Sequence, residues 1–124
     1  MQWPVDPAVY TDCDHLKQVH KTIAKIAITI SAFEPVIMLA DTAFHASASK
    51  ILSDQVELWN IPTSELWCRD SAPITAFEES GQRVVSHIQF NGWGNKPPHK
   101  HDAQIAKRVA EALDFNVIPS DLVG

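Results

Sequence analysis

The sequence has little of what marks several common protein classes. It contains only two cysteines in 124 residues, Cys13 and Cys68, too few for a disulfide framework and without the CxxC spacing of many metal sites. No apolar run is long enough to cross a membrane. The first residues also lack the charged and apolar stretches of a signal peptide. We therefore expect a cytoplasmic protein with no membrane partner.

Positive charge is also scarce. Ten Lys and Arg residues stand against fifteen Asp and Glu residues, which gives a formal net charge of -5. Proteins that bind nucleic acids usually gather basic residues on one stripe, whereas these are scattered, so no nucleic-acid partner is expected. The balance of 45% hydrophobic and 20% charged residues is typical of a globular chain. No linker is visible, so we expect a single domain over 1–124.

The spacing of apolar residues predicts helices alternating with strands in the first half of the chain. After an irregular lead-in over 1–10, Asp12 begins a helix that runs to Pro35. A buried strand is expected over 35–40, a helix capped by Asp41 over 42–52, and a strand over 55–60. The inner stripe of the first helix should consist of apolar residues three or four positions apart: Leu16, Val19, Ile23, Ile26, Ala27 and Ile30.

The second half predicts a hairpin, a helix and a last strand. Residues 67–73 should be extended, the strands over 73–77 and 83–90 should be joined by a turn at Gly81, and 91–101 should be a loop. Asp102 should cap a helix to about Leu113, with Ile105, Val109 and Leu113 facing inward, before a strand over 115–118. Together these elements predict an α/β fold of the α+β type, with helices packed on one side of a mixed sheet.

The strongest chemical signal is the segment Trp67-Cys68-Arg69-Asp70-Ser71-Ala72-Pro73. In an extended segment Cys68 and Asp70 would share one face, and Trp67 and Arg69 the other. A carboxylate fixed at a strand end could hold a cationic ligand. The alternative is structural: Arg69 and Asp70 form a surface ion pair and Trp67 belongs to the core.

A second signal is Phe90-Asn91-Gly92-Trp93-Gly94-Asn95-Lys96. Glycines on both sides of Trp93 allow unusual backbone angles and the close approach of a ligand. The alternative is an ordinary loop held in place by one buried tryptophan.

The remaining reactive side chains point to neither a metal site nor a nucleophile. His99, His101 and Asp102 lie close together, but a closed metal site needs three or four converging ligands, so we expect a solvated loop and no metal. If Cys68 shares a face with Asp70, the carboxylate disfavours a thiolate there. Nothing else converges on Cys13, so both cysteines are interpreted as packing residues.

The two tryptophan-containing segments, in this order, resemble the Trp-x-Arg-Asp-x-Gly-Pro and Phe-Asn-x-Trp-Gly segments of the agmatine deiminase and bacterial peptidylarginine deiminase family. The resemblance extends over nearly the whole chain. It includes Trp3-Pro4, the Phe33-Glu34-Pro35-Val36 run, the Ile61-Pro62-Thr63 run and the sequence HDAQIAKRVAEAL. Ala72 departs from the family pattern, since it replaces the usual glycine.

The resemblance implies a pentein fold built from ββαβ units, and hydrolysis of a guanidinium to a ureido group and ammonia without a cofactor. It also implies that Asp70 binds a guanidinium, that Trp67 and Arg69 shape and brace the pocket, and that Asn91 and Trp93 lie on the loop beside it. The ligand would be a guanidino small molecule, agmatine or arginine-like.

In that family the nucleophilic cysteine and a His-x-Asp pair lie well downstream of the matched segments. We therefore expect an N-terminal part of such an enzyme, inactive alone and self-associating through exposed strand edges. The alternative is a non-catalytic binding or interaction module derived from the same family.

Overall fold

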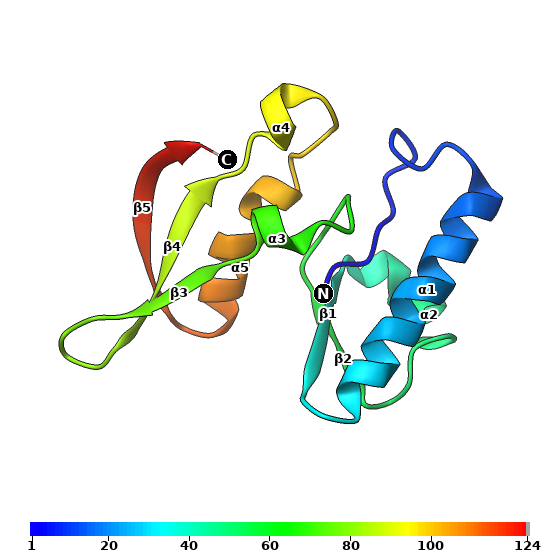
Figure 1. The fold of residues 1–124 in the computed structure, drawn as a ribbon, viewed down its shortest axis with the longest axis horizontal. Helices are drawn as coiled ribbons and strands as arrows, with labels where there is room; N and C mark the ends of the chain where they lie inside the picture. Colours follow the sequence, from blue (N-terminus) through cyan, green and yellow to red (C-terminus); the bar gives the residue numbers. More distant parts are fainter. Residues whose placement is uncertain (124) are drawn as a thin grey trace. The chain divides into compact units, whose positions relative to one another are not determined.

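The computed structural model describes residues 1–123, which group into two compact units, Met1–Leu66 and a second that begins at Trp67. Figure 1 shows the elements of both units in chain order. Each unit has its own sheet, β1-β2 in the first and β3-β4-β5 in the second. The expectation of a single domain over 1–124 stays a prediction.

The sheet of the first unit pairs two parallel strands, β1 (Val36–Ala40) and β2 (Val56–Asn60). The lead-in predicted to be irregular runs along the other edge of β1. The backbone N–H of Trp3 donates to the carbonyl oxygen of Leu39 at 2.9 Å, and that of Leu39 donates to Met1 at 2.8 Å. The lead-in therefore continues the sheet by an isolated bridge.

Both predicted helix starts of the first unit are confirmed. Asp12 accepts backbone hydrogen bonds from His15 and Asp14 at the start of α1 (Cys13–Ser31), and these bonds lower the pKa of its carboxyl group. Asp41 accepts from the backbone N–H of Ala43 at the start of α2 (Thr42–Ser49). Each side chain satisfies donors that have no partner within the helix.

Small residues bring α1 close to the sheet. Ala24 and Ala27 are the buried residues of α1, while Ile26, predicted to face inward, is 44% exposed. The residues of α1 that are buried are therefore those on the turns that contact the sheet, and not those with the largest apolar side chains. The buried core of this unit consists of Trp3, Ala24, Ala27, Val36, Met38, Ala40, Ala48, Leu52 and Val56.

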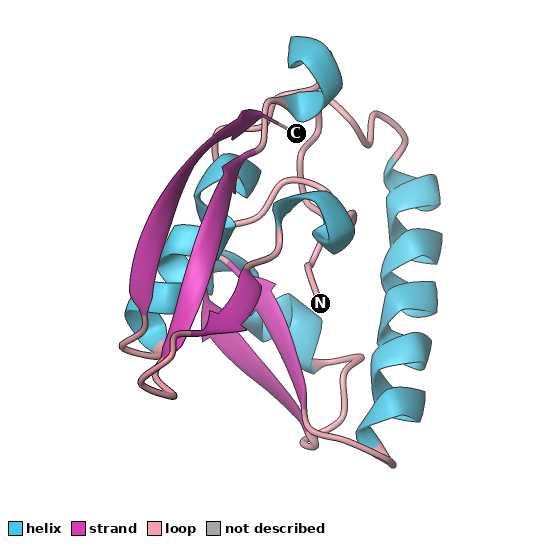
Figure 2. Cartoon of the chain, turned by 60° about the vertical axis from the view of Figure 1, so that its left-hand side comes forward, coloured by secondary structure: helices cyan, strands magenta, loops and turns pink. Residues whose placement is uncertain are grey.

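The second unit contains the three-stranded sheet β3-β4-β5, seen from another side in Figure 2. β3 (Ile74–Phe77) and β4 (Arg83–Gln89) are antiparallel, and β5 (Asn116–Val123) is parallel to β4. Gly81 has φ +82° in the hairpin turn, as its predicted role requires. With the helix between β4 and β5, the order is ββαβ.

That helix is α5 (Ile105–Ala112), preceded by the 3-10 turn η1 (Asp102–Gln104). The prediction that Asp102 caps the helix is wrong, because it lies inside η1 with 2% exposure and Gln104 holds the N-cap position of α5. Leu113 does not face inward either, since it is 42% exposed. The contact with the sheet is made by Ala106 and Ala110 against Val85, Phe115 and Val117.

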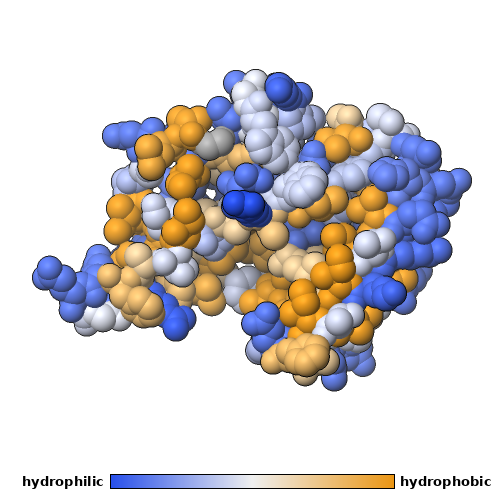
Figure 3. Space-filling model, viewed as in Figure 1, coloured by the Kyte–Doolittle hydropathy of each residue, from blue (hydrophilic) through white to orange (hydrophobic). Residues whose placement is uncertain are grey.

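The predicted mixed α/β class is confirmed, with the difference that the strands form two small sheets rather than one. Apolar side chains remain at the surface of the second unit, where Ile74, Ile118 and Leu122 are 45–67% exposed. Figure 3 shows such side chains over the region of β4 and β5. Among the described residues no helix has the length and apolarity to cross a membrane, and the cytoplasmic location stays a prediction.

Candidate functional site

The segment that carries Asp70 is a helical turn and not the predicted extended segment. α3 (Cys68–Ser71) is one turn long, and the backbone N–H of Ala72 donates to the carbonyl oxygen of Cys68 at 2.8 Å. The turn ends at Ala72 because a residue before proline avoids the helical region. Ala72 has φ -69° and ψ 154°, a conformation open to any residue, so alanine in place of the family's glycine is tolerated.

Both parts of the structural alternative for this segment are contradicted. Arg69 and Asp70 are exposed and form no ion pair with each other within the part of the chain that the structure describes. Trp67 is 56% exposed and therefore is not a core residue. The segment thus presents a carboxylate, a guanidinium and an indole ring at the surface, and the fold of the described residues uses none of their polar groups.

The helical turn also removes one argument about Cys68. On a strand Cys68 and Asp70 would share a face, but two positions along a helix correspond to a rotation of about 200°. The prediction that the carboxylate and the thiol share a face is therefore wrong. Cys68 is half-buried and Cys13 is exposed.

The second predicted segment forms an unusual left-handed turn. α4 (Gly92–Asn95) has positive φ at all four positions: +65° at Gly92, +51° at Trp93, +82° at Gly94 and +61° at Asn95. Its hydrogen bonds still span four residues, since the backbone N–H of Asn95 donates to Asn91 at 2.8 Å. Left-handed helical backbone costs an L-residue with a side chain roughly 1–2 kcal/mol. The prediction of unusual backbone angles beside Trp93 is therefore confirmed.

Aromatic contacts and one amide hold this turn. The Phe90 ring meets Trp93 edge-on at a centroid distance of 5.1 Å and His99 at 6.2 Å. The Asn91 side chain accepts from the backbone N–H of Gly94 at 2.9 Å. Phe90 is the buried residue of this group and Trp93 is 38% exposed, so the loop is not held in place by a buried tryptophan.

The register of the hairpin places both segments at one end of the sheet. Ile74, at the start of β3, pairs with Ser86, close to the end of β4. The segment 67–71 enters β3 from this end, and the segment 91–95 leaves β4 at the same end, opposite the hairpin turn (Figure 1). No hydrogen bond joins Asn91 to the Asp70 carboxylate, which has no hydrogen-bonding partner among the described residues.

A hollow of about 280 Å³ opens beside the ends of β4 and β5. His87 and Gln89 of β4 line it together with Phe90, which follows β4, and η1 and β5 complete its wall. The pairing of β4 with β5 shifts register there, between His87 and Gln89. None of the predicted site residues lines this hollow. In the described part of the chain no three His, Cys, Asp or Glu side chains converge as metal ligands would.

One feature of this end was missed at the sequence level, namely that the turn is left-handed as a whole. The alternation of Asn and Gly over 91–95 was the available signal, because these residues adopt positive φ most readily. His99 was interpreted as a solvated loop residue, yet it is half-buried and stacks edge-on against Phe90.

Comparison with known proteins gives one family. The sequence model of the Porphyromonas-type peptidyl-arginine deiminase family matches residues 1–124. A Streptomyces coelicolor protein provisionally named an agmatine deiminase is 32% identical over 125 residues, which cover 99% of this chain and 37% of that protein. A Listeria monocytogenes protein with the same provisional name is 30% identical over 100 residues, 77% of this chain and 28% of its own length.

Solved structures show the same fold. The agmatine deiminase of Enterococcus faecalis superposes with a TM-score of 0.85 at 21% identity, over 98% of this chain and 34% of that one. The agmatine deiminase of C. jejuni with substrate bound superposes with a TM-score of 0.80 at 20% identity, over 97% and 35%. The chain thus spans about a third of the length of these relatives. It belongs to the Porphyromonas-type peptidyl-arginine deiminase family.

Proposed function

We propose that the second unit binds the guanidinium group of an agmatine- or arginine-like substrate through Asp70. This binding would serve the hydrolysis of the guanidinium to a ureido group and ammonia. The observation that carries the proposal is the exposed Asp70 carboxylate, which has no hydrogen bond or ion pair among the described residues and follows the exposed Trp67 by three positions in the same helical turn.

A guanidinium is planar, permanently cationic and carries five N–H donors in a fixed fork. A carboxylate matches two of these donors at once, and charge-assisted pairs of this kind are about twice as strong as neutral hydrogen bonds. An indole face adds a cation–π contact of roughly 0.5–1 kcal/mol at an exposed site. Asp70 and Trp67 offer these two groups within one helical turn.

Arg69 and the loop would have supporting roles. Arg69 is adjacent to Asp70 and carries the same charge as the substrate, so it would orient the turn and would not contact the guanidinium. Asn91 fixes the left-handed turn through its hydrogen bond to Gly94, and this turn presents Trp93 at the same end of the sheet. Trp93 would therefore border the substrate from the other segment.

We further propose that these 124 residues bind the substrate and do not turn it over. The family resemblance assigns the attack on the guanidinium carbon to a cysteine thiolate and the proton transfers to a histidine, and neither role matches a residue of this chain. A thiolate needs a neighbouring base or cation to form at neutral pH. The thiol of Cys68 makes no ion pair or hydrogen bond among the described residues.

Titration of the chain with agmatine, followed by NMR chemical shifts, tests the binding role. Putrescine serves as the ligand control, because it keeps an amine and lacks the guanidinium. We expect agmatine to shift the resonances of Trp67 and Asp70, and Asp70→Asn to abolish this shift. Asp121→Asn is the matched variant, since Asp121 is an exposed acid in the same unit.

Two results would contradict the proposal in different ways. Equal agmatine affinity in the parent chain and in Asp70→Asn would remove Asp70 from the site. Formation of ureido product by the parent chain, lost in Cys68→Ala, would show that the nucleophile is present here after all. A third result would favour the alternative of a binding module. In this case a longer protein that contains these residues would bind a guanidinium through Asp70 and would show no hydrolase activity.

A further inference from the structure

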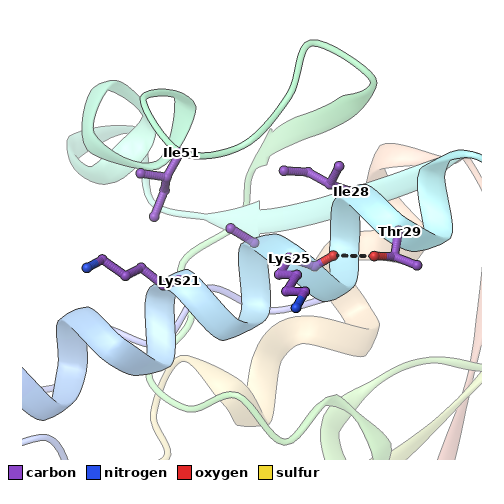
Figure 4. Close-up of a pocket in the computed structure, with 6 residues that line it drawn as sticks. Lys21, Lys25, Ile28, Thr29 and Ile51 are labelled. Carbon is purple, nitrogen blue, oxygen red and sulfur yellow. Dashed lines mark hydrogen bonds between the residues drawn. The ribbon is translucent and has the colours of Figure 1, made fainter.

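A groove on α1 in the first unit takes no part in the proposed function. Ala24, Ile28 and Ile51 form its apolar floor, Lys21 and Lys25 border it, and its volume is about 290 Å³ (Figure 4). Two lysines beside an open apolar floor do not define one occupant, so the groove identifies no ligand. A more specific chemistry is present in the second unit, at the left-handed turn α4.

The reactive feature of that turn is the peptide bond between Asn91 and Gly92. When glycine follows asparagine, its backbone nitrogen can reach the asparagine carboxamide, because glycine has no side chain to block the approach. This is the one Asn-Gly pair in the sequence. Asn60, Asn95 and Asn116 are followed by isoleucine, lysine and valine, whose side chains hinder the same attack.

The reaction of such a pair is deamidation through a succinimide ring. The backbone nitrogen of Gly92 loses its proton and bonds to Cγ of Asn91, the Cγ–Nδ2 bond breaks, and ammonia leaves with that proton. Water then adds to either carbonyl carbon of the ring and opens it. Opening at one carbon gives aspartate, and opening at the other gives isoaspartate, in which the main chain runs through Cβ and Cγ.

The folded turn prevents this attack by its geometry. Asn91 has φ -110° and ψ 15°, which directs the Gly92 nitrogen away from the Asn91 side chain across the Cα–C bond. The Asn91 side chain also accepts a hydrogen bond from the backbone N–H of Gly94 at 2.9 Å, which holds the carboxamide toward Gly94. Ring closure requires rotation about ψ and loss of this hydrogen bond, so the turn must open first.

The backbone of the turn favours opening. Trp93 and Asn95 carry side chains at φ +51° and +61°, and left-handed backbone shifts the equilibrium toward the open form by about fivefold or more for each. The backbone N–H of Gly92 donates no hydrogen bond within the described residues, so no acceptor holds its nitrogen. We infer that Asn91 is a deamidation site and that opening of the left-handed turn sets the rate of the reaction.

The two products should have opposite effects on the turn. An aspartate product keeps the side-chain oxygen that accepts from Gly94, so the turn closes again. An isoaspartate product lengthens the main chain by one carbon. It changes the register of the hydrogen bonds from Gly94 and Asn95 to Asn91, which are 2.9 and 2.8 Å in the closed turn. We expect this second product to leave the turn open and Trp93 unrestrained.

Peptide mapping by mass spectrometry of the full 124-residue chain, incubated at neutral pH, tests the inference. In the urea-unfolded chain Asn91 should deamidate faster than Asn60, Asn95 and Asn116, which serve as internal controls. In the folded chain the rate at Asn91 should be about tenfold lower or more, because the turn is open for a small fraction of the time.

Two glycines distinguish opening of this turn from unfolding of the whole second unit. Gly94 and Gly81 both have φ +82°, and a Cβ at either would meet no atom within 4 Å. Gly94→Ala should raise the rate at Asn91 in the folded chain about fivefold, because the strain favours the open turn. Gly81→Ala, which places the same strain in the hairpin turn, should leave this rate unchanged. In urea both variants should react at the rate of the parent chain.

The Asn91→Asp variant separates the effects of the two products. It should give the Trp93 indole resonance of the folded parent chain. The isoaspartyl fraction, isolated by ion exchange, should instead give a resonance close to that in urea. A loss of agmatine binding in that fraction would also rest on the proposed function, so the mapping and the resonance are both measured without ligand.

Three results would overturn the inference. Asn91 could deamidate at the same rate in the folded and the urea-unfolded chain, which would show that the turn does not protect it. Gly81→Ala could accelerate the reaction as much as Gly94→Ala, which would assign the control to unfolding of the whole unit. The other three asparagines could also react as fast as Asn91 in urea, which would show that its glycine neighbour confers no reactivity.

Discussion

The left-handed turn at 92–95 makes a sharp prediction about two glycines that have similar backbone angles and different surroundings. Gly92 has φ +65° and Gly94 has φ +82°, so alanine is strained at both. A Cβ at Gly94 would meet no atom within 4 Å. A Cβ at Gly92 would lie 2.5 Å from Nδ1 of His99 and 3.0 Å from the carbonyl oxygen of Pro97. A comparison of the two alanine substitutions therefore distinguishes the cost of backbone strain from the cost of a steric clash.

The expected magnitudes follow from these distances. Gly94→Ala should lower the free energy of unfolding by about 1 kcal/mol, the cost of left-handed backbone for a residue with a Cβ. Gly92→Ala carries the same strain and in addition must displace the His99 ring and a backbone carbonyl. Overpacking of this kind costs about 1–3 kcal/mol, so the total should be about 2–5 kcal/mol.

Urea unfolding gives these values if the second unit is followed by itself, for example through hydrogen exchange of the Val85 amide in β4. His99→Ala in the Gly92→Ala background should recover part of the loss, because the ring clash disappears and the contact with Pro97 remains. Equal destabilisation by Gly92→Ala and Gly94→Ala, or no recovery in the double variant, would refute the clash.

Other predictions concern stability. Because the folded-state pKa of Asp12 is lowered, its contribution to α1 should be present above the ordinary carboxyl pKa and be lost as the pH falls through the lowered value. Asp12→Asn should remove this dependence from the helical circular dichroism. Ile105→Ala should cost about 2–5 kcal/mol in urea unfolding and Leu113→Ala less than about 1 kcal/mol, since Ile105 is 0% and Leu113 42% exposed. Tyr10→Phe should cost about 1.5–3 kcal/mol by thermal unfolding, because it removes a 3.0 Å hydrogen bond to the buried Glu65 carboxylate.

The parts of the fold that were predictable depend on local rules. Asp12 and Asp41 mark helix starts because their side chains bind nearby backbone N–H groups, an interaction within three residues. Gly81 marks the hairpin because the turn requires positive φ. These interactions can be predicted without knowing what lies across the core.

The wrong predictions depend on distant neighbours or on segments too short to show a period. α3 is a single turn, so its sequence contains no repeat that distinguishes helix from strand. Ile26 fits the apolar stripe of α1 yet is exposed, because the contact with the sheet selects Ala24 and Ala27. Aspartate is a residue type that favours N-cap positions, but Asp102 is buried inside η1.

The candidate site was predictable in composition and not in geometry. The Asp70 carboxylate has no partner among the described residues, and Trp93 has a backbone conformation that costs energy, so neither residue is explained by the stability of the second unit. Strain persists where the surroundings impose it, and it is concentrated at ligand sites. Both residues lie on segments at the same end of one hairpin. A carboxylate already paired within the fold could not also hold a substrate, so an unpaired acid and a strained tryptophan at one end of the hairpin are what a binding site for a cation would require.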